Sequence, residues 1–201
     1  MYATAVVGAL LLAVAAYKLI KRALGGQSAD STEIDDLRKK VREQFAVGDP
    51  SFREGNTQQL SNACTGGDTA ACAQLKELNS RHLQRAMKYI EQRYPDVVNR
   101  AQPVTIEWDD AGILSPGNDH GASGRFLFGS RTIILARNYN SLGALVETLG
   151  HELLHAGQSP LGAGAMVVED WLWRRFGFER GYIHDHIAAQ AARIRAGLPL
   201  R

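Results

Sequence analysis

The sequence predicts an α+β fold that is mainly helical, with a small antiparallel sheet and an apolar helix ahead of the folded part. Three observations predict it. Apolar residues recur at helical spacing before residue 95 and again after residue 141. Between them, the three short stretches 103–108, 125–128 and 132–135 have the β-branched and aromatic residues typical of strands. The order of helices, strands and helices is that of an α+β domain.

The first 26 residues differ from the rest of the chain. Residues 2–17 carry no charge, and Lys18, Lys21 and Arg22 follow them. A membrane-spanning helix needs about 20 apolar residues, and this stretch reaches that length if Lys18 extends its amine to the membrane surface. We therefore expect residues 1–26 to form a membrane-inserting helix that makes the protein membrane-associated. A secretory signal and a helix packed on the domain are the alternatives.

The remainder divides into a linker with an amphipathic helix, residues 27–50, and one compact domain, residues 51–201. Gly48, Asp49 and Pro50 end the amphipathic helix. In the domain, Asp68 or Thr69 caps a long helix that stops before Pro95, and Gly129-Ser130 predicts a tight type II′ hairpin turn. Asn140 or Ser141 caps a helix over residues 142–156. A further helix is expected over residues 165–176, and residues 181–186 open the last one.

Composition excludes some classes of function. The 23 basic and 21 acidic residues are spread along the chain and leave a net charge of +2. Because the sequence has no block of basic residues, we do not expect a nucleic-acid partner. Cys64 and Cys72 lack the spacing of a zinc knuckle. They form either a short disulfide loop or two buried thiols, and the sequence leaves both open.

The motif with chemical meaning is His151-Glu152-Leu153-Leu154-His155, inside the helix over residues 142–156. Histidines four residues apart lie on one helix face, where their imidazoles can take adjacent corners of a zinc tetrahedron. Glu152 lies one step round the helix and can accept a proton from a water at the metal. The other faces of this helix are apolar, and burying these three side chains without a metal would cost several kcal/mol unless all were hydrogen-bonded.

The stretch from Glu147 to Gly157 resembles the active-site helix of zincin metallopeptidases, and the likeness extends from about residue 132 to residue 186. It implies that residues 51–201 form a zincin-like domain, that His151 and His155 bind zinc, and that Glu152 is the general base. Metzincins place Gly and His where this chain has Gln158 and Leu161, which excludes that family. The pattern that remains resembles gluzincins, which take a third ligand, a glutamate, from a following helix.

Helical phase selects among the acidic residues of the expected helix 165–176. Glu169 lies on an apolar row, where a carboxylate needs a partner such as zinc. Asp170 lies where it can pair with Arg174 on a solvated side. We therefore predict Glu169 as the third ligand, and Asp170, His184 and His186 remain alternatives.

Other residues are predicted to assist the reaction. His184 or Tyr182, at the start of the last helix, could stabilise the oxyanion of a tetrahedral intermediate. Asp170 or Glu147 could hold a ligand imidazole, although an exposed position is expected for Glu147. The strand over residues 132–136 could hold an extended substrate by edge pairing.

The resemblance implies a zinc endopeptidase acting on protein or peptide substrates. A short apolar helix, a linker and a compact HExxH domain also look like the metallopeptidase toxin domains of bacterial polymorphic toxins or secreted effectors, which would be delivered outside the cell. Two alternatives remain. One is a zinc hydrolase of non-peptide amides such as peptidoglycan cross-links, and the other is a catalytically silent, membrane-tethered interaction domain with structural zinc.

Overall fold

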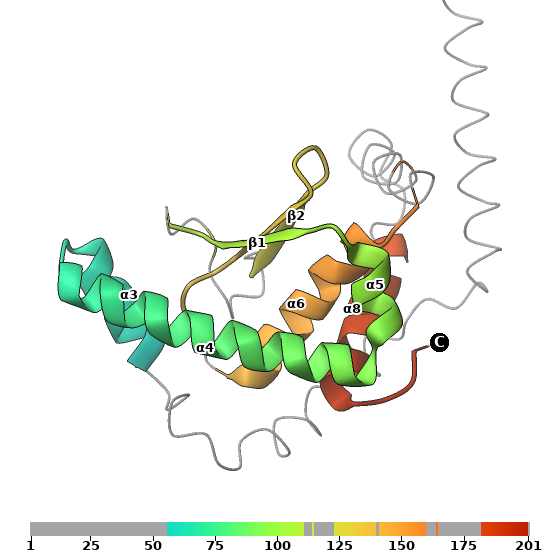
Figure 1. Cartoon of the computed structure of the whole chain (residues 1–201), viewed down its shortest axis with the longest axis horizontal. Coiled ribbons are helices and arrows are strands. Elements are labelled where there is room, and N and C mark those ends of the chain that lie inside the picture. Colours follow the sequence, from blue (N-terminus) through green and yellow to red (C-terminus); the bar gives the residue numbers. More distant parts are fainter. Residues whose placement is uncertain are drawn as a thin grey trace, which may run out of the picture.

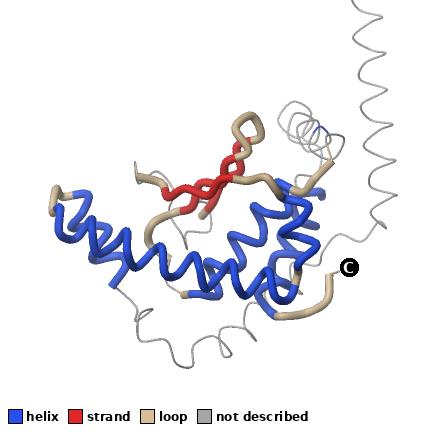
Figure 2. The backbone as a smooth tube through the Cα atoms, in the orientation of Figure 1, coloured by secondary structure: helices blue, strands red, loops and turns tan. Residues whose placement is uncertain are grey.

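The computed structural model describes residues 56–110, 114, 123–139, 141–159, 164 and 182–200. Within these ranges the chain forms five helices and one three-stranded sheet, which is an α+β fold (Figure 2). The segments predicted as a membrane-inserting helix (1–26) and as a linker with an amphipathic helix (27–50) lie outside the described residues. None of the described helices has the length and apolar character to cross a membrane.

Two helices at the start of the described chain form a hairpin. Helix α3 (Asn56–Thr65) is followed by the long helix α4 (Thr69–Arg93), and Asp68 caps α4 by accepting hydrogen bonds from the amides of Ala70 and Ala71. This confirms one of the two predicted caps. Cys64 and Cys72 form a disulfide across the turn, which decides between the two possibilities that the sequence left open.

Helix α6 (Leu142–Ala156) occupies the middle of the core and has the bounds predicted from the sequence. The Ser141 side chain caps it by accepting a hydrogen bond from the Ala144 amide. Leu145, Leu149 and Leu153 of α6 are fully buried. A short helix α5 (Pro95–Ala101), not expected from the sequence, and the last helix α8 (Tyr182–Ala196) pack against α6.

The sheet is mixed, so the prediction of an antiparallel sheet was wrong in part. Its strand order is β1 (Thr105–Trp108), β3 (Thr132–Leu135), β2 (Gly124–Leu127). Strands β2 and β3 form the expected antiparallel hairpin, whereas β1 pairs with β3 in parallel. The 15 residues between β1 and β2 are long enough to join strands that are not neighbours, and β3 lies between them.

The hairpin turn also differs from the expected type II′ turn. Four residues, 128–131, connect the paired residues Leu127 and Thr132, and the positive φ of 51° is at Arg131 instead of Gly129. Arg131 offsets that conformation with hydrogen bonds to three carbonyls, those of Ala101, Pro103 and Ala156. The turn is thereby tied to α5 and to the end of α6.

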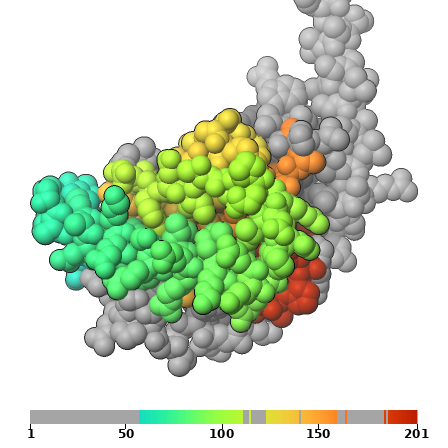
Figure 3. Space-filling view, viewed as in Figure 1, coloured from blue at the N-terminus to red at the C-terminus, as the bar shows by residue number. Residues whose placement is uncertain are grey.

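These elements form two layers (Figure 1). The sheet lies on one side of α6, α4 runs along the molecule, and α8 packs beside α6. In the space-filling view, α3, α4, α5 and the strands form most of the coloured surface of this face (Figure 3). The core therefore holds α6 between α4, α8 and the sheet, so that the side chains of α6 have fixed positions.

Candidate metal centre

The two histidines of the motif lie on one face of α6, as the sequence predicted. The Nε2 atoms of His151 and His155 are 2.9 Å apart, and the ring centroids are separated by 4.6 Å. Their spacing of four residues places the two rings one turn apart on the same side of the helix. Both rings therefore present Nε2 to the same point.

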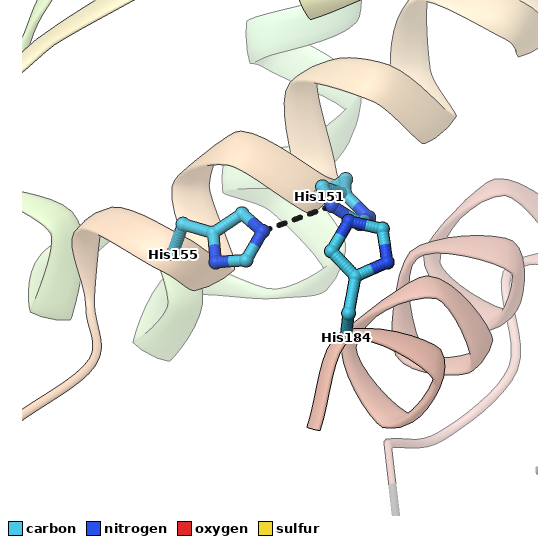
Figure 4. A group of neighbouring side chains, drawn as sticks. All are labelled: His151, His155 and His184. Carbon is cyan, nitrogen blue, oxygen red and sulfur yellow. Dashed lines mark hydrogen bonds between the residues drawn. The ribbon is translucent and has the colours of Figure 1, made fainter. Parts of the chain in front are cut away.

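His184, from the first turn of α8, completes a group of three (Figure 4). Its ring centroid lies 4.8 Å from that of His151 and 5.8 Å from that of His155. One nitrogen from each ring can be chosen so that all three lie within 4.8 Å of one another. Among the described residues this is the group that could hold a metal ion. His155 is buried, His151 is half-buried and His184 is exposed.

The packing of α8 on α6 places His184 at this point. Gly150 has no side chain, and an ideal Cβ there would lie 3.1 Å from Cδ1 of Ile194. One helical turn away, Arg195 donates a hydrogen bond of 2.8 Å to Glu147, and both side chains are almost fully buried. The expectation that Glu147 is exposed was therefore wrong, because its carboxylate serves as the partner of Arg195.

Glu152 follows His151 on α6, and its side chain lies against strand β2. Its side chain is 5% exposed, and burial raises its pKa to about 7, although a hydrogen bond from the backbone of Phe126 acts in the opposite direction. An ideal Cβ on Gly124 would lie only 3.2 Å from Oε1 of Glu152. The strand thus approaches the carboxyl group closely because residue 124 has no side chain.

His155 has the properties of a ligand imidazole. Burial, together with the nearby charge of His184, lowers its pKa to about 4. The ring is therefore neutral at physiological pH, which is the form that binds metal ions. Its second nitrogen, Nδ1, is buried and has no hydrogen-bond partner in the described part of the chain.

The other predicted site residues are distributed as follows. Glu169 and Asp170 lie outside the described residues, as does the predicted helix 165–176. Tyr182 is the first residue of α8, but its side chain is not described. His186 is half-buried, burial lowers its pKa, and it is not part of the histidine group.

The strand predicted to hold a substrate by edge pairing is not an edge. Strand β3 is hydrogen-bonded to β1 on one side and to β2 on the other, so neither side of this strand is open for pairing with a substrate. The prediction failed because the parallel pairing of β1 with β3 has no signal in the local sequence. The free edges of the described sheet belong to β1 and β2.

Comparisons with models of protein families, with curated proteins and with solved structures find no match for this chain. The class of site is therefore defined by its own side chains, which are three imidazoles and one buried carboxyl group.

Proposed function

We propose that the protein is a zinc-dependent hydrolase, and specifically a metallopeptidase that acts on protein or peptide substrates. The observation that carries the proposal is the convergence of three imidazoles from α6 and α8 next to Glu152, a buried carboxyl group. The choice of a peptide bond as the substrate rests on the resemblance of the HELLH segment to zincins.

The three histidines fit a zinc ion. Imidazole nitrogen is a common zinc ligand, and Zn–N bonds of about 2.0–2.1 Å place tetrahedral ligand atoms about 3.4 Å apart. His151 and His155 are already near that separation, at 2.9 Å. A nitrogen of His184 lies within 4.8 Å of both, so a shift of its ring by at most about 1.4 Å would bring all three within zinc-binding distance.

Three protein ligands are typical of catalytic zinc, whereas structural sites usually have four. When bound, zinc supplies a Lewis acid and lowers the pKa of a coordinated water to about 7. A site with three histidine ligands therefore favours hydrolysis over the alternative of a silent interaction domain with structural zinc. Glu169, from outside the described residues, remains the alternative third ligand.

Glu152 follows His151 on α6 and has a pKa suited to a general base. Because its pKa is about 7, it can take up a proton and release it near neutral pH without a large cost in either direction. In the proposed reaction it accepts the proton of the attacking water and then passes it to the nitrogen of the leaving amine. The carboxyl group is held ready for this by the contact with Gly124 and by the backbone of Phe126.

Zinc binding can be measured on the full chain purified in detergent. We expect about one zinc per protein in the wild type, measured by mass spectrometry of the metal, and loss of zinc in His155→Ala and His184→Ala but not in Glu169→Ala. The reverse result for the last two variants would make Glu169 the third ligand. A wild type that binds no zinc, even after reconstitution, would overturn the proposal.

Hydrolysis is tested separately with fluorescently labelled casein. Glu152→Gln should keep its zinc and lose about 10²–10⁴-fold in rate, because the amide cannot accept the proton. Inactivity of the zinc-loaded wild type on casein, together with cleavage of peptidoglycan cross-links, would favour the alternative amide hydrolase. The proposals that the protein is a toxin or effector, and that residues 1–26 attach it to a membrane, depend on segments outside the described residues.

A further inference from the structure

The orientation of the His155 ring raises the question of what holds it. Its Nε2 faces His151, so Nδ1 is on the far side of the ring from the histidine group. There Nδ1 is enclosed by protein and makes no hydrogen bond within the described residues. An unpaired buried N–H costs about 1–3 kcal/mol, so a nearby acceptor would stabilise one tautomer of the ring.

Gln158 offers such an acceptor. It lies two residues beyond the end of α6, directly after the C-cap residue Gly157. The backbone N–H of Gln158 donates a hydrogen bond of 3.2 Å to the carbonyl of His155, which fixes the backbone of Gln158 at the end of α6. Its side-chain oxygen, Oε1, is also buried and also lacks a partner among the described residues. One buried donor and one buried acceptor are therefore left over at the same place.

The two side chains already influence each other. Their atoms do not meet the geometry of a full hydrogen bond, yet the Gln158 side chain lies close enough to the His155 ring to act as its hydrogen-bond partner. A hydrogen bond between these two atoms would satisfy both of them. Ligand histidines in metal sites commonly donate their second N–H to an oxygen in this way.

We infer that Gln158 is a positioning residue that accepts a hydrogen bond from Nδ1 of His155 and thereby leaves Nε2 unprotonated and turned toward His151 and His184. This rests on the proposed function for its purpose, because a fixed Nε2 lone pair matters when the ring binds a metal. The contact is local to the end of α6 and does not involve the substrate. It therefore predicts an effect on metal affinity in the absence of any substrate.

The test compares two replacements of similar size in the full chain. Gln158→Met removes the acceptor, Gln158→Glu keeps it, and Gln92→Met on the exposed surface of α4 is the matched control. Zinc affinity is measured by competition with a chromophoric chelator. We expect Gln158→Met to bind zinc about 10–100-fold more weakly than the wild type. Gln158→Glu and Gln92→Met should differ from the wild type by less than about threefold.

A second measurement separates this inference from the proposed function. In metal-free protein labelled with ¹⁵N, the His155 ring of the wild type should carry its proton on Nδ1, and in Gln158→Met it should shift toward a mixture of both tautomers. Equal zinc affinity of Gln158→Met and wild type, or a wild-type ring protonated on Nε2, would overturn the inference. A wild type that binds no zinc would overturn the proposed function, and the tautomer would still decide the role of Gln158.

Discussion

Replacing Gly124 by alanine probes the contact between strand β2 and the general base. An ideal Cβ at residue 124 would lie 2.6 Å from Cγ2 of Thr148 and 3.1 Å from Cγ of Glu152. Carbon atoms that are not bonded prefer separations of about 3.5–4.0 Å. The strand and the helix must therefore separate by about 1 Å, or the two side chains of α6 must move by a similar distance.

The strand is not free to make this movement. The carbonyl of Ser123, immediately before Gly124, accepts hydrogen bonds from the hydroxyl of the buried Tyr139 and from the amide of Ala136. The displacement is therefore expected in Glu152 and Thr148. Overpacking of this kind costs about 1–3 kcal/mol of stability, and a misplacement of about 1 Å in a catalytic group can cost about 10²-fold in rate.

The assay measures unfolding in urea, zinc content and casein hydrolysis for Gly124→Ala, and for the same change combined with Thr148→Ser. The serine removes Cγ2, the nearest atom, so the double variant should recover stability. Hydrolysis should stay reduced in the double variant because the contact with Glu152 remains, and zinc content should be normal in both. Wild-type stability and wild-type hydrolysis in Gly124→Ala would refute the reasoning.

Three further predictions concern stability. The pKa of Glu152 is raised from 4.5 to about 7, so its contribution to folding is present below pH 4.5 and is lost as the pH rises through 7. A shift of one pKa unit corresponds to about 1.36 kcal/mol. In urea unfolding without metal, the free energy of unfolding of Glu152→Gln should therefore exceed that of the wild type by about 3 kcal/mol at pH 8 and equal it at pH 4. Arg195→Met should destabilise the protein by about 3–5 kcal/mol because it breaks the ion pair between two side chains that are almost fully buried. Adding Glu147→Gln should restore most of that loss in thermal unfolding, and an unchanged melting temperature in the single variant would contradict the burial of the pair. Replacing Cys64 and Cys72 by serine should cost about 2–3 kcal/mol, because the disulfide closes a loop with a sequence separation of 8, and should leave zinc binding intact; a loss of zinc would show that the α3–α4 hairpin supports the metal centre.

Local signals explain which elements were predicted correctly. The bounds of α6 follow from a capping serine at residue 141 and an apolar pattern that ends at Gly157, both of which act within a few residues. The cap at Asp68 and the β2–β3 hairpin are local in the same sense. The tight turn was placed correctly but assigned the wrong type, because Arg131 takes the left-handed conformation with the help of three distant carbonyls.

Long-range packing explains the features that the sequence did not reveal. The parallel pairing of β1 with β3 depends on the path of the intervening chain, so it has no local pattern. Glu147 was expected in solvent because its partner Arg195 is 48 residues away. The role inferred for Gln158 was missed as well, because this residue lies just beyond the end of α6, where helical periodicity no longer predicts the direction of a side chain.

The local sequence is enough to predict that His151 and His155 share one face of a buried helix with Glu152 one step round it, because helical periodicity fixes the directions of side chains four residues apart. Tertiary packing selects the distant residues that meet that face. His184 joins the two histidines because Gly150 lets α8 approach α6 and because the Glu147–Arg195 pair holds the two helices together. Glu152 is buried at a pKa near 7 because Gly124 lets β2 come close to it. Both are close approaches between segments far apart in the chain, and such contacts depend on packing rather than on local sequence.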